Sequence, residues 1–101
     1  RLEAEVTIAL YRIAQEALNN IVKHSRADRA WINLRCSEDQ VILRVGDNGR
    51  GFDKNSQQSH RLGLPIMRER AEAVGGELRI VSQPDLGTEV TVLWQRTKET
   101  A

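Results

Sequence analysis

The sequence has little cysteine, few aromatic residues and no excess of charge of one sign, and these shortages exclude several classes of protein. A single cysteine, Cys36, among 101 residues excludes an internal disulfide and is typical of a reducing cytoplasm. The formal net charge is only +1, so overall charge does not favour binding to nucleic acid or to an anionic membrane. No apolar run approaches the roughly 20 residues that cross a bilayer, and no signal-peptide pattern is present. The composition, with 40% hydrophobic residues, favours one globular domain over residues 1–101.

Several well-known catalytic and binding motifs are also missing. Neither His24 nor His60 has a second His or Cys at zinc-ligand spacing. The sequence contains no G-x-S-x-G nucleophile motif, no G-x-x-x-x-G-K-[ST] phosphate loop and no Rossmann glycine fingerprint. If this chain binds a nucleotide, it therefore uses a different architecture.

Hydrophobic periodicity predicts the order helix, strand, strand, helix, strand, strand. Apolar residues recur at helical spacing over residues 3–23 and again over residues 63–74. Alternating patterns predict strands at about residues 30–37, 41–46, 77–80 and 89–94. Since the strands are polar on one side, this order favours an α+β fold, with helices on one face of a mixed, mostly antiparallel sheet.

The alternation within strands also predicts which side chains are buried. In the first strand Ile32, Leu34 and Cys36 share the apolar parity, so this row is expected to face the core. We expect Cys36 to be a small core residue. Trp94 has the inward parity of its strand and is expected in the core, whereas Trp31 is expected at the surface.

The stretch Val45–Phe52 places an acid, followed by two glycines, at the end of an apolar strand. Alternate residues from Val41 share one face, which is apolar until it reaches Asp47. A carboxylate there is costly unless a donor hydrogen-bonds to it, and an amino-bearing heterocycle such as adenine would supply one. The alternative is a β-hairpin turn, because Asn-Gly is a strong hairpin signal. The polar stretch 50–62 has no strand or helix period, which weakens that alternative and is typical of a lid or binding loop.

Glu16, Asn20 and Lys23 lie at i, i+4 and i+7 on one stripe of the first helix. Asn20 borders the apolar stripe and needs partners, and one candidate is a hard cation such as Mg²⁺, which takes side-chain and phosphate oxygens. Lys23 could meet a phosphate oxygen, and Glu16 could act as a base or orient a water. The alternative is a solvated helix face with an ordinary hydrogen bond.

Two further segments with glycine allow a functional and a purely structural interpretation. A helix that begins at Gly63-Leu64-Pro65 would present free N–H groups to a phosphate, or Gly63 would simply let the chain enter the helix. Gly87-Thr88 stands at a strand start, where a plain turn glycine and strand threonine are the alternative.

Together these segments resemble the GHKL ATPase superfamily in four motifs that occur in order. Residues 16–24 (Glu-Ala-Leu-Asn-Asn-Ile-Val-Lys-His) resemble its N box, and residues 47–52 (Asp-Asn-Gly-Arg-Gly-Phe) resemble its D-x-G-x-G box. Residues 63–76 resemble its second glycine box, and residues 87–90 (Gly-Thr-Glu-Val) resemble its closing G-T-x-V. Within these motifs, the segments Met-Arg-Glu-Arg-Ala (67–71) and Lys-His (23–24) are similar to the corresponding segments of sensor histidine kinases of the nitrate/nitrite-sensor and DesK-like type.

The resemblance implies an adenine site around the D-x-G-x-G box. Asp47 would accept the hydrogen bond of the adenine amino group, and Thr88 would stand beside it. Gly49 and Gly51 would let the adenine and the lid approach, and residues 50–62 would form the ATP lid.

The resemblance also implies a phosphate and metal site. Asn20 would hold a Mg²⁺ ion that bridges the phosphates, and Glu16 would lie near the transfer site as a candidate base. Lys23 and His24 would lie close to the phosphates or ribose, and Gly63 and Leu64 would present backbone N–H groups to the phosphates.

The fold implied is the Bergerat fold, a two-layer α/β sandwich, and the function implied is that of the catalytic domain of a two-component sensor histidine kinase. Such a domain binds Mg²⁺-ATP and donates the γ-phosphoryl group to a histidine on a separate helical dimerization domain. The partners implied are this phosphoacceptor domain and a response regulator, within a homodimeric parent. The expected location is a cytoplasmic domain, with membrane anchoring of the parent left open.

The sequence departs from the family pattern in its second glycine box, where Arg61, Pro65 and Ile66 stand at positions that are often glycine. The first strand that usually precedes the N-box helix is expected to be missing or truncated, and the phosphoacceptor segment to be absent. This fragment is therefore not expected to phosphorylate itself. Two alternatives are a degenerate module that serves protein–protein contact and a GHKL serine kinase of the anti-sigma type.

Overall fold

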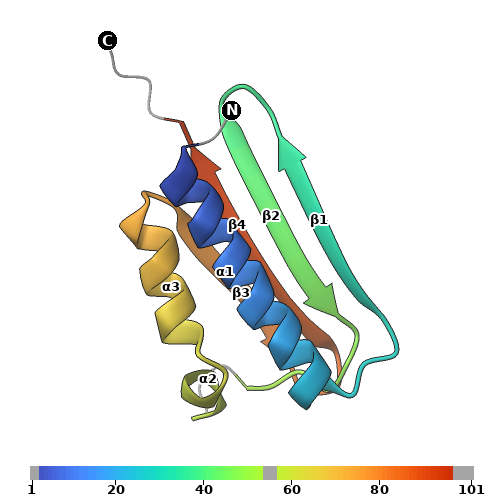
Figure 1. The fold of residues 1–101 in the computed structure, drawn as a ribbon. Coiled ribbons are helices and arrows are strands. Elements are labelled where there is room, and N and C mark those ends of the chain that lie inside the picture. The colour runs from blue at the N-terminus through green and yellow to red at the C-terminus, as the bar shows by residue number, and fades with distance from the viewer. Residues whose placement is uncertain (1–2, 54–56, 97–101) are drawn as a thin grey trace.

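The structure, a computed structural model, describes residues 3–53 and 57–96 and has two layers (Figure 1). Four strands form one sheet, and the helices α1 and α3 pack on one of its faces. All three strand pairs of this sheet are antiparallel, which confirms the predicted α+β class. No helix within the described residues is long and apolar enough to span a bilayer.

The elements follow the predicted order, with two short additions. The elements are α1 (Ala4–Asn20), the π-helix η1 (Ile21–Ser25), β1 (Ala30–Cys36), β2 (Gln40–Asp47), α2 (Gln58–Arg61), α3 (Leu64–Ala73), β3 (Glu77–Gln83) and β4 (Gly87–Gln95). The prediction that the stretch 50–62 has no helix was wrong at α2, while residues 54–56 of that predicted lid lie outside the described residues. The π-helix η1 extends α1 beyond the predicted end, and π-helical turns often mark functional sites.

The sheet brings together strands that are distant in the sequence. Its strand order is β1-β2-β4-β3, so β2 and β4 are central neighbours although α2, α3 and β3 separate them in the chain. Their register places Asp47, the last residue of β2, opposite Thr88 near the start of β4. Figure 1 shows the end of α1 and the short helix α2 at this same lower end of the sheet. The fold therefore gathers three of the four motif segments at one place.

The core lies between the sheet and the two longer helices. The buried apolar residues of α1 and α3 are Val6, Ala9, Leu10, Ile13, Ala17, Leu64, Met67 and Ala71. All of them except Ala9 belong to one core cluster with the inward row of β2 and β4, which is Val41, Leu43, Val45, Val90, Val92 and Trp94. Trp94 is 7% exposed and its indole N–H donates to the carbonyl of Val74 at 2.9 Å, which confirms its predicted place in the core.

The prediction that β1 faces the core was wrong. Ile32 and Leu34 are 54% and 57% exposed, and Cys36 is exposed as well. Their parity was assigned correctly, because Ile32 pairs with the buried Val45 and points to the same face of the sheet. However, β1 is an edge strand, and Figure 1 shows it on the far side of β2 from both α1 and α3.

Trp31 lies on the opposite face of β1 and is 42% exposed, which confirms its predicted surface position. Its ring lies against Gly46, where an added Cβ atom would come within 2.5 Å of the ring. The indole N–H donates to a carboxylate oxygen of Glu89 at 3.3 Å. The outer face of the sheet thus carries an aromatic side chain that packs across β2 toward β4.

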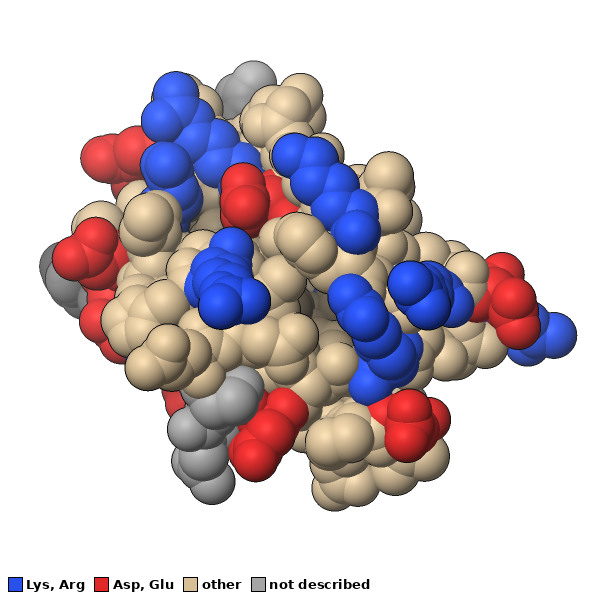
Figure 2. Space-filling view, turned by 90° about the horizontal axis from the view of Figure 1, so that it is seen from below, with Lys and Arg blue, Asp and Glu red and all other residues tan. Residues whose placement is uncertain are grey.

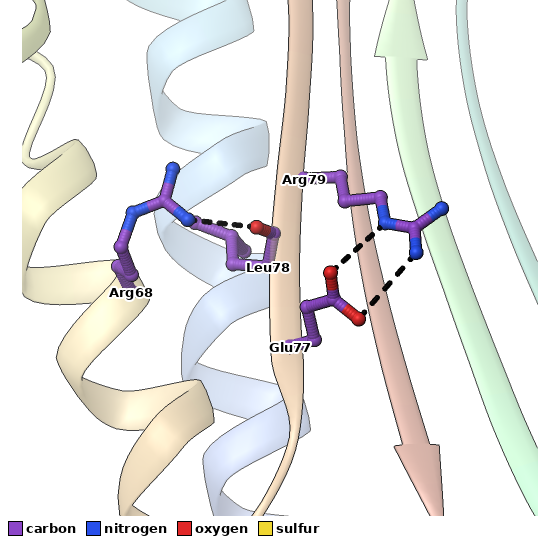
Figure 3. A network of polar contacts seen from close by, with 4 residues as sticks. All are labelled: Arg68, Glu77, Leu78 and Arg79. Atoms are coloured by element: carbon purple, nitrogen blue, oxygen red, sulfur yellow. Dashed lines mark hydrogen bonds and ion pairs between the residues drawn. The ribbon is translucent and has the colours of Figure 1, made fainter.

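Two polar contacts involve β3, the other edge strand, one to α3 and one within the strand (Figure 3). The guanidinium of Arg68 in α3 donates to the carbonyl of Leu78 at 2.8 Å, which occupies a backbone acceptor of an edge strand. Arg79 and Glu77 form an ion pair at 3.2 Å, but their side chains are 65% and 57% exposed. Such an exposed pair contributes at most about 1 kcal/mol to stability.

The open position of β1 gives a testable difference in stability. We expect Leu34→Ala to lower the free energy of unfolding by less than about 1 kcal/mol, because the side chain is already half in water. The matched substitution Leu43→Ala removes the buried residue paired with Leu34 in β2 and should cost clearly more. Urea unfolding followed by circular dichroism measures both, and equal losses would mean that β1 is buried as the sequence predicted.

Candidate functional site

A pocket lies at the lower end of the molecule, between the end of α1, the end of β2 and the segment that leads into α3. Its apolar lining residues include Ile21, Val45, Phe52, Leu62, Leu64 and Val90. Its polar lining includes Asn20, His24, Asp47, Arg50 and Thr88. An apolar cavity with a few polar groups is the usual form of a small-molecule site.

Asp47 is the buried acid of this pocket. It is 5% exposed, and its Oδ1 accepts a hydrogen bond from the backbone N–H of Gly49 at 2.7 Å. No other described group donates to this carboxylate, and no fully buried side-chain oxygen or nitrogen among the described residues lacks a partner. The second oxygen, Oδ2, must therefore reach the pocket surface, where it is an acceptor for a ligand. The hairpin alternative for this stretch was wrong, because β2 pairs with β1 and β4 and the chain leaves the sheet after Asp47.

Thr88 lies beside Asp47, as the resemblance implied, because the two residues pair across β2 and β4. The hydroxyls of Thr88 and Ser82 are 2.6 Å apart, and Ser82 is 6% exposed. The Ser82 hydroxyl also accepts the backbone N–H of Phe52 at 2.9 Å. Ser82 thus fixes both Thr88 and the chain that follows Asp47.

Gly49 and Gly51 are required by the protein backbone itself. An added Cβ atom at Gly49 would lie 2.1 Å from the carbonyl oxygen of Ser25. Gly51 has a φ of +59°, and its added Cβ atom would lie 2.1 Å from the carbonyl oxygen of Gln83. The loop after Asp47 is therefore packed tightly between the end of the first helix and the turn that joins β3 to β4. The approach of adenine to these glycines stays a prediction.

Asn20 lines the pocket at the last residue of α1. Its side-chain Nδ2 donates to the carbonyl of Leu62 at 2.8 Å, which leaves Oδ1 without a donor among the described residues. No cluster of three or more His, Cys, Asp or Glu that could hold a metal occurs in the described residues. One amide oxygen fits Mg²⁺ bound together with a nucleotide, because this ion takes one or two protein ligands and completes its shell with phosphates and waters.

The remaining predicted residues divide between the pocket and its border. His24 and Leu64 line the pocket, whereas Lys23 is exposed on the same π-helical turn. Glu16 lies in a neighbouring groove between α1 and α3, and its carboxylate oxygen would be 3.5 Å from an added Cβ atom at Gly63. The structure therefore brings Glu16 and Gly63 together beside the pocket.

Sequence reasoning missed three residues that hold this site together, Ser25, Arg50 and Ser82. The Ser25 hydroxyl donates to the carbonyl of Ile21 at 2.9 Å within the π-helix. The backbone N–H of Arg50 donates to the carbonyl of Ser25 at 2.8 Å. Inward strand parity was a signal for Ser82, but no local pattern pointed to Ser25 or Arg50 as a pair, because the contact between them joins distant parts of the chain.

Figure 2 shows this lower end of the molecule in space-filling form. Lys and Arg side chains lie around its centre, and acidic side chains lie among them and toward the edges of the view. The geometry is thus an apolar cavity with one free carboxylate oxygen inside, on a face that carries charges of both signs.

A comparison of the sequence with known families decides which family this is. Residues 5–98 match the family described as "Histidine kinase-, DNA gyrase B-, and HSP90-like ATPase". The chain belongs to this ATPase family. The pocket with Asp47 is therefore the candidate ATP site of an ATPase domain of the histidine kinase type.

Relatives of this ATPase domain are found among sensor proteins and histidine kinases. It is 41% identical to the sensor protein VraS of Staphylococcus saprophyticus over 90 residues, which is 89% of this chain and 26% of VraS. The chain thus spans about a quarter of the length of the curated relatives it matches.

Solved structures share the two-layer fold of this ATPase domain. A histidine kinase domain from a blue-light activated histidine kinase of Erythrobacter litoralis has a TM-score of 0.73 at 24% identity and covers 88% of this chain and 44% of its own. The ATP binding domain of PrrB from Mycobacterium tuberculosis has a TM-score of 0.67 at 25% identity and covers 83% of this chain and 64% of its own. The predicted α/β sandwich is confirmed.

Proposed function

We propose that this ATPase domain binds Mg²⁺-ATP in the pocket at Asp47 and, within a longer sensor histidine kinase, donates the γ-phosphoryl group to a histidine on a separate helical domain. The observation that carries the proposal is the free carboxylate oxygen of Asp47 in an otherwise apolar cavity. A few polar groups in an otherwise apolar cavity are what orient a small ligand, and an acceptor among them favours a ligand that brings a donor.

Adenine suits this cavity because its exocyclic amino group is a hydrogen-bond donor on a flat apolar ring. In the proposed complex the amino group donates to Asp47, and Thr88 lies beside it. The side chains of Val45 and Val90 on neighbouring strands and of Ile21 on η1 would then cover the ring. A base that presents only an acceptor at this position would leave Asp47 unpaired.

The phosphates would extend toward η1 and the start of α3. Asn20 would ligate Mg²⁺ through its free oxygen, and Lys23 and His24 on the next turn would meet phosphate or ribose oxygens. The backbone N–H of Leu64, the first residue of α3, would add a donor for the phosphates, whereas the N–H of Gly63 already donates to the carbonyl of His60. Phosphoryl transfer depends mainly on positioning and charge neutralisation, which these groups provide. Glu16 remains the proposed base, from its groove beside the pocket.

The proposal includes the partners of the whole protein. These are a helical dimerization and phosphoacceptor domain, a response regulator and a second copy of the parent chain, with this domain on the cytoplasmic side. The test is transfer of labelled phosphate from ATP to the full-length protein. Acid-labile label on a histidine supports the proposal, label on a protein serine supports the anti-sigma type, and docking to a helical partner without any nucleotide supports the degenerate module.

The role of Asn20 is tested by its dependence on metal. We expect Asn20→Ala to weaken the binding of Mg²⁺-ATP about fivefold, because one charge-assisted contact of about 1 kcal/mol is lost. Binding of ATP in the presence of EDTA should change little, because no metal then needs the amide oxygen. Calorimetric titration with and without Mg²⁺ measures this, with the exposed neighbour Asn19→Ala as the matched control. Equal losses with Mg²⁺ and with EDTA would assign Asn20 a role that does not involve the metal.

A further inference from the structure

The end of the first helix carries three of the residues proposed to hold the phosphates, and it is an irregular end. After Asn20 the helix continues as the π-helix η1 and stops at Arg26, whose φ of 54° is left-handed. The last carbonyl groups of a helix have no donor within the helix and need one from elsewhere. π-Helical turns have no great stability of their own and occur mostly as single turns. The position of Lys23 and His24 therefore depends on what binds the end of η1.

A single residue of another segment, Arg50, binds this end twice. Its backbone N–H donates to the carbonyl of Ser25 at 2.8 Å, and its side-chain Nε–H donates to the carbonyl of His24 at 2.6 Å. Among the described residues, Arg50 is the only one outside η1 whose side chain donates to a carbonyl of that turn. A guanidinium at a helix C-terminus also interacts favourably with the helix dipole.

Arg50 is itself held in place from the other side. Its carbonyl accepts the backbone N–H of Asp85, in the turn between β3 and β4, at 2.6 Å. The neighbouring Gly49 and Gly51 lie against the backbone of the helix end and of that turn, with no room for a side chain. Arg50 therefore joins the loop of Asp47 to the end of η1 through a segment with little freedom to move.

We infer that Arg50 is a positioning residue, which clamps the π-helical end of the first helix so that Asn20, Lys23 and His24 face the phosphates while Asp47 holds the adenine. This inference rests on the proposed function. Since the side-chain contact is to the helix end and the adenine acceptor lies in the loop, loss of the side chain should affect the phosphate side of the site more than the adenine side. The backbone contact of position 50 to Ser25 remains in any substitution.

The test compares Arg50→Met, which keeps most of the side-chain length and removes the donors, with Arg35→Met. Arg35 is an exposed residue of β1, so the control loses the same charge away from the pocket. Amide hydrogen exchange, followed by NMR without nucleotide, measures the local stability of residues 21–25. Calorimetric titration with Mg²⁺-ATP measures binding at the adenine and phosphate sides together, and titration with adenosine measures binding without the phosphates.

For Arg50→Met we expect faster amide exchange in residues 21–25, Mg²⁺-ATP binding weakened about three- to tenfold, and adenosine binding unchanged within about twofold. Arg35→Met should change none of these. Unchanged exchange would overturn the clamp, and faster exchange with unchanged ATP affinity would overturn its role in positioning. Equal losses for ATP and adenosine would show a general disturbance of the site and also overturn it. If the wild-type chain bound neither ligand, the proposed function would fail and the positioning role with it, while the exchange data would still show whether the clamp exists.

Discussion

Asp47→Asn is expected to weaken ATP binding about ten- to a hundredfold, which corresponds to about 1–3 kcal/mol. The substituted amide keeps one oxygen, which can still accept the backbone N–H of Gly49 as Oδ1 does now. Its NH₂ group then takes the place of Oδ2 and meets the adenine amino group, so that two donors face each other. The buried hydrogen bond is lost and a donor is left without an acceptor.

Calorimetric titration with a non-hydrolysable ATP analogue measures this loss. The matched control is Asp39→Asn, which removes a carboxylate from the exposed turn between β1 and β2. The control should bind like the wild type, and the thermal unfolding of both variants shows whether they are folded. Wild-type affinity in folded Asp47→Asn would contradict the assignment of Asp47 as the adenine acceptor.

Gly51→Ala is expected to lower the free energy of unfolding by about 2–4 kcal/mol. Two effects add up at this position. Its φ of +59° is left-handed, which costs a residue with a side chain about 1–2 kcal/mol. In addition, the new Cβ atom would lie 2.1 Å from the carbonyl oxygen of Gln83 and 3.0 Å from that of Gly87, so the backbone must shift.

Gly75→Ala is a control that separates these two effects. Gly75 has a φ of +85°, but nothing lies within 4 Å of an added Cβ atom. We therefore expect it to lose only the conformational part, about 1–2 kcal/mol. Urea unfolding of both variants gives the difference. If Gly51→Ala cost no more than Gly75→Ala, the junction around Asp47 would be loose, and the tight packing described above would be wrong.

The helices and most of the strands could be predicted from the sequence because they depend on local patterns, whereas the grouping of the pocket residues came from the family resemblance. Helical spacing identified the buried stripe of α1, and strand parity identified Asp47 as an acid at the end of an apolar row. The pairing of Asp47 with Thr88 agrees with the family resemblance, which placed them together before any register was known.

The errors concern features that depend on tertiary arrangement. The apolar row of β1 has the same alternation as a core strand, and only the position of the helices leaves Ile32 and Leu34 in water. The helix α2 has four residues of polar character, too few for a periodic signal. The contact of Arg50 with His24 spans 26 residues of sequence, and no sequence pattern around either residue indicates it. Contacts of this kind complete the site, but no window of sequence contains them.

The central claim is that the pocket at Asp47 holds the adenine of Mg²⁺-ATP. The most direct test is an NMR titration of the wild-type chain with a non-hydrolysable ATP analogue and Mg²⁺, followed through the backbone amide signals. We predict that the shifts concentrate at the pocket, on Asp47, Gly49 and Thr88 around the adenine and on residues 20–25 around the phosphates, while the signals of β1 from Asn33 to Cys36 stay in place. A well-folded chain whose pocket signals do not move at millimolar nucleotide would contradict the claim.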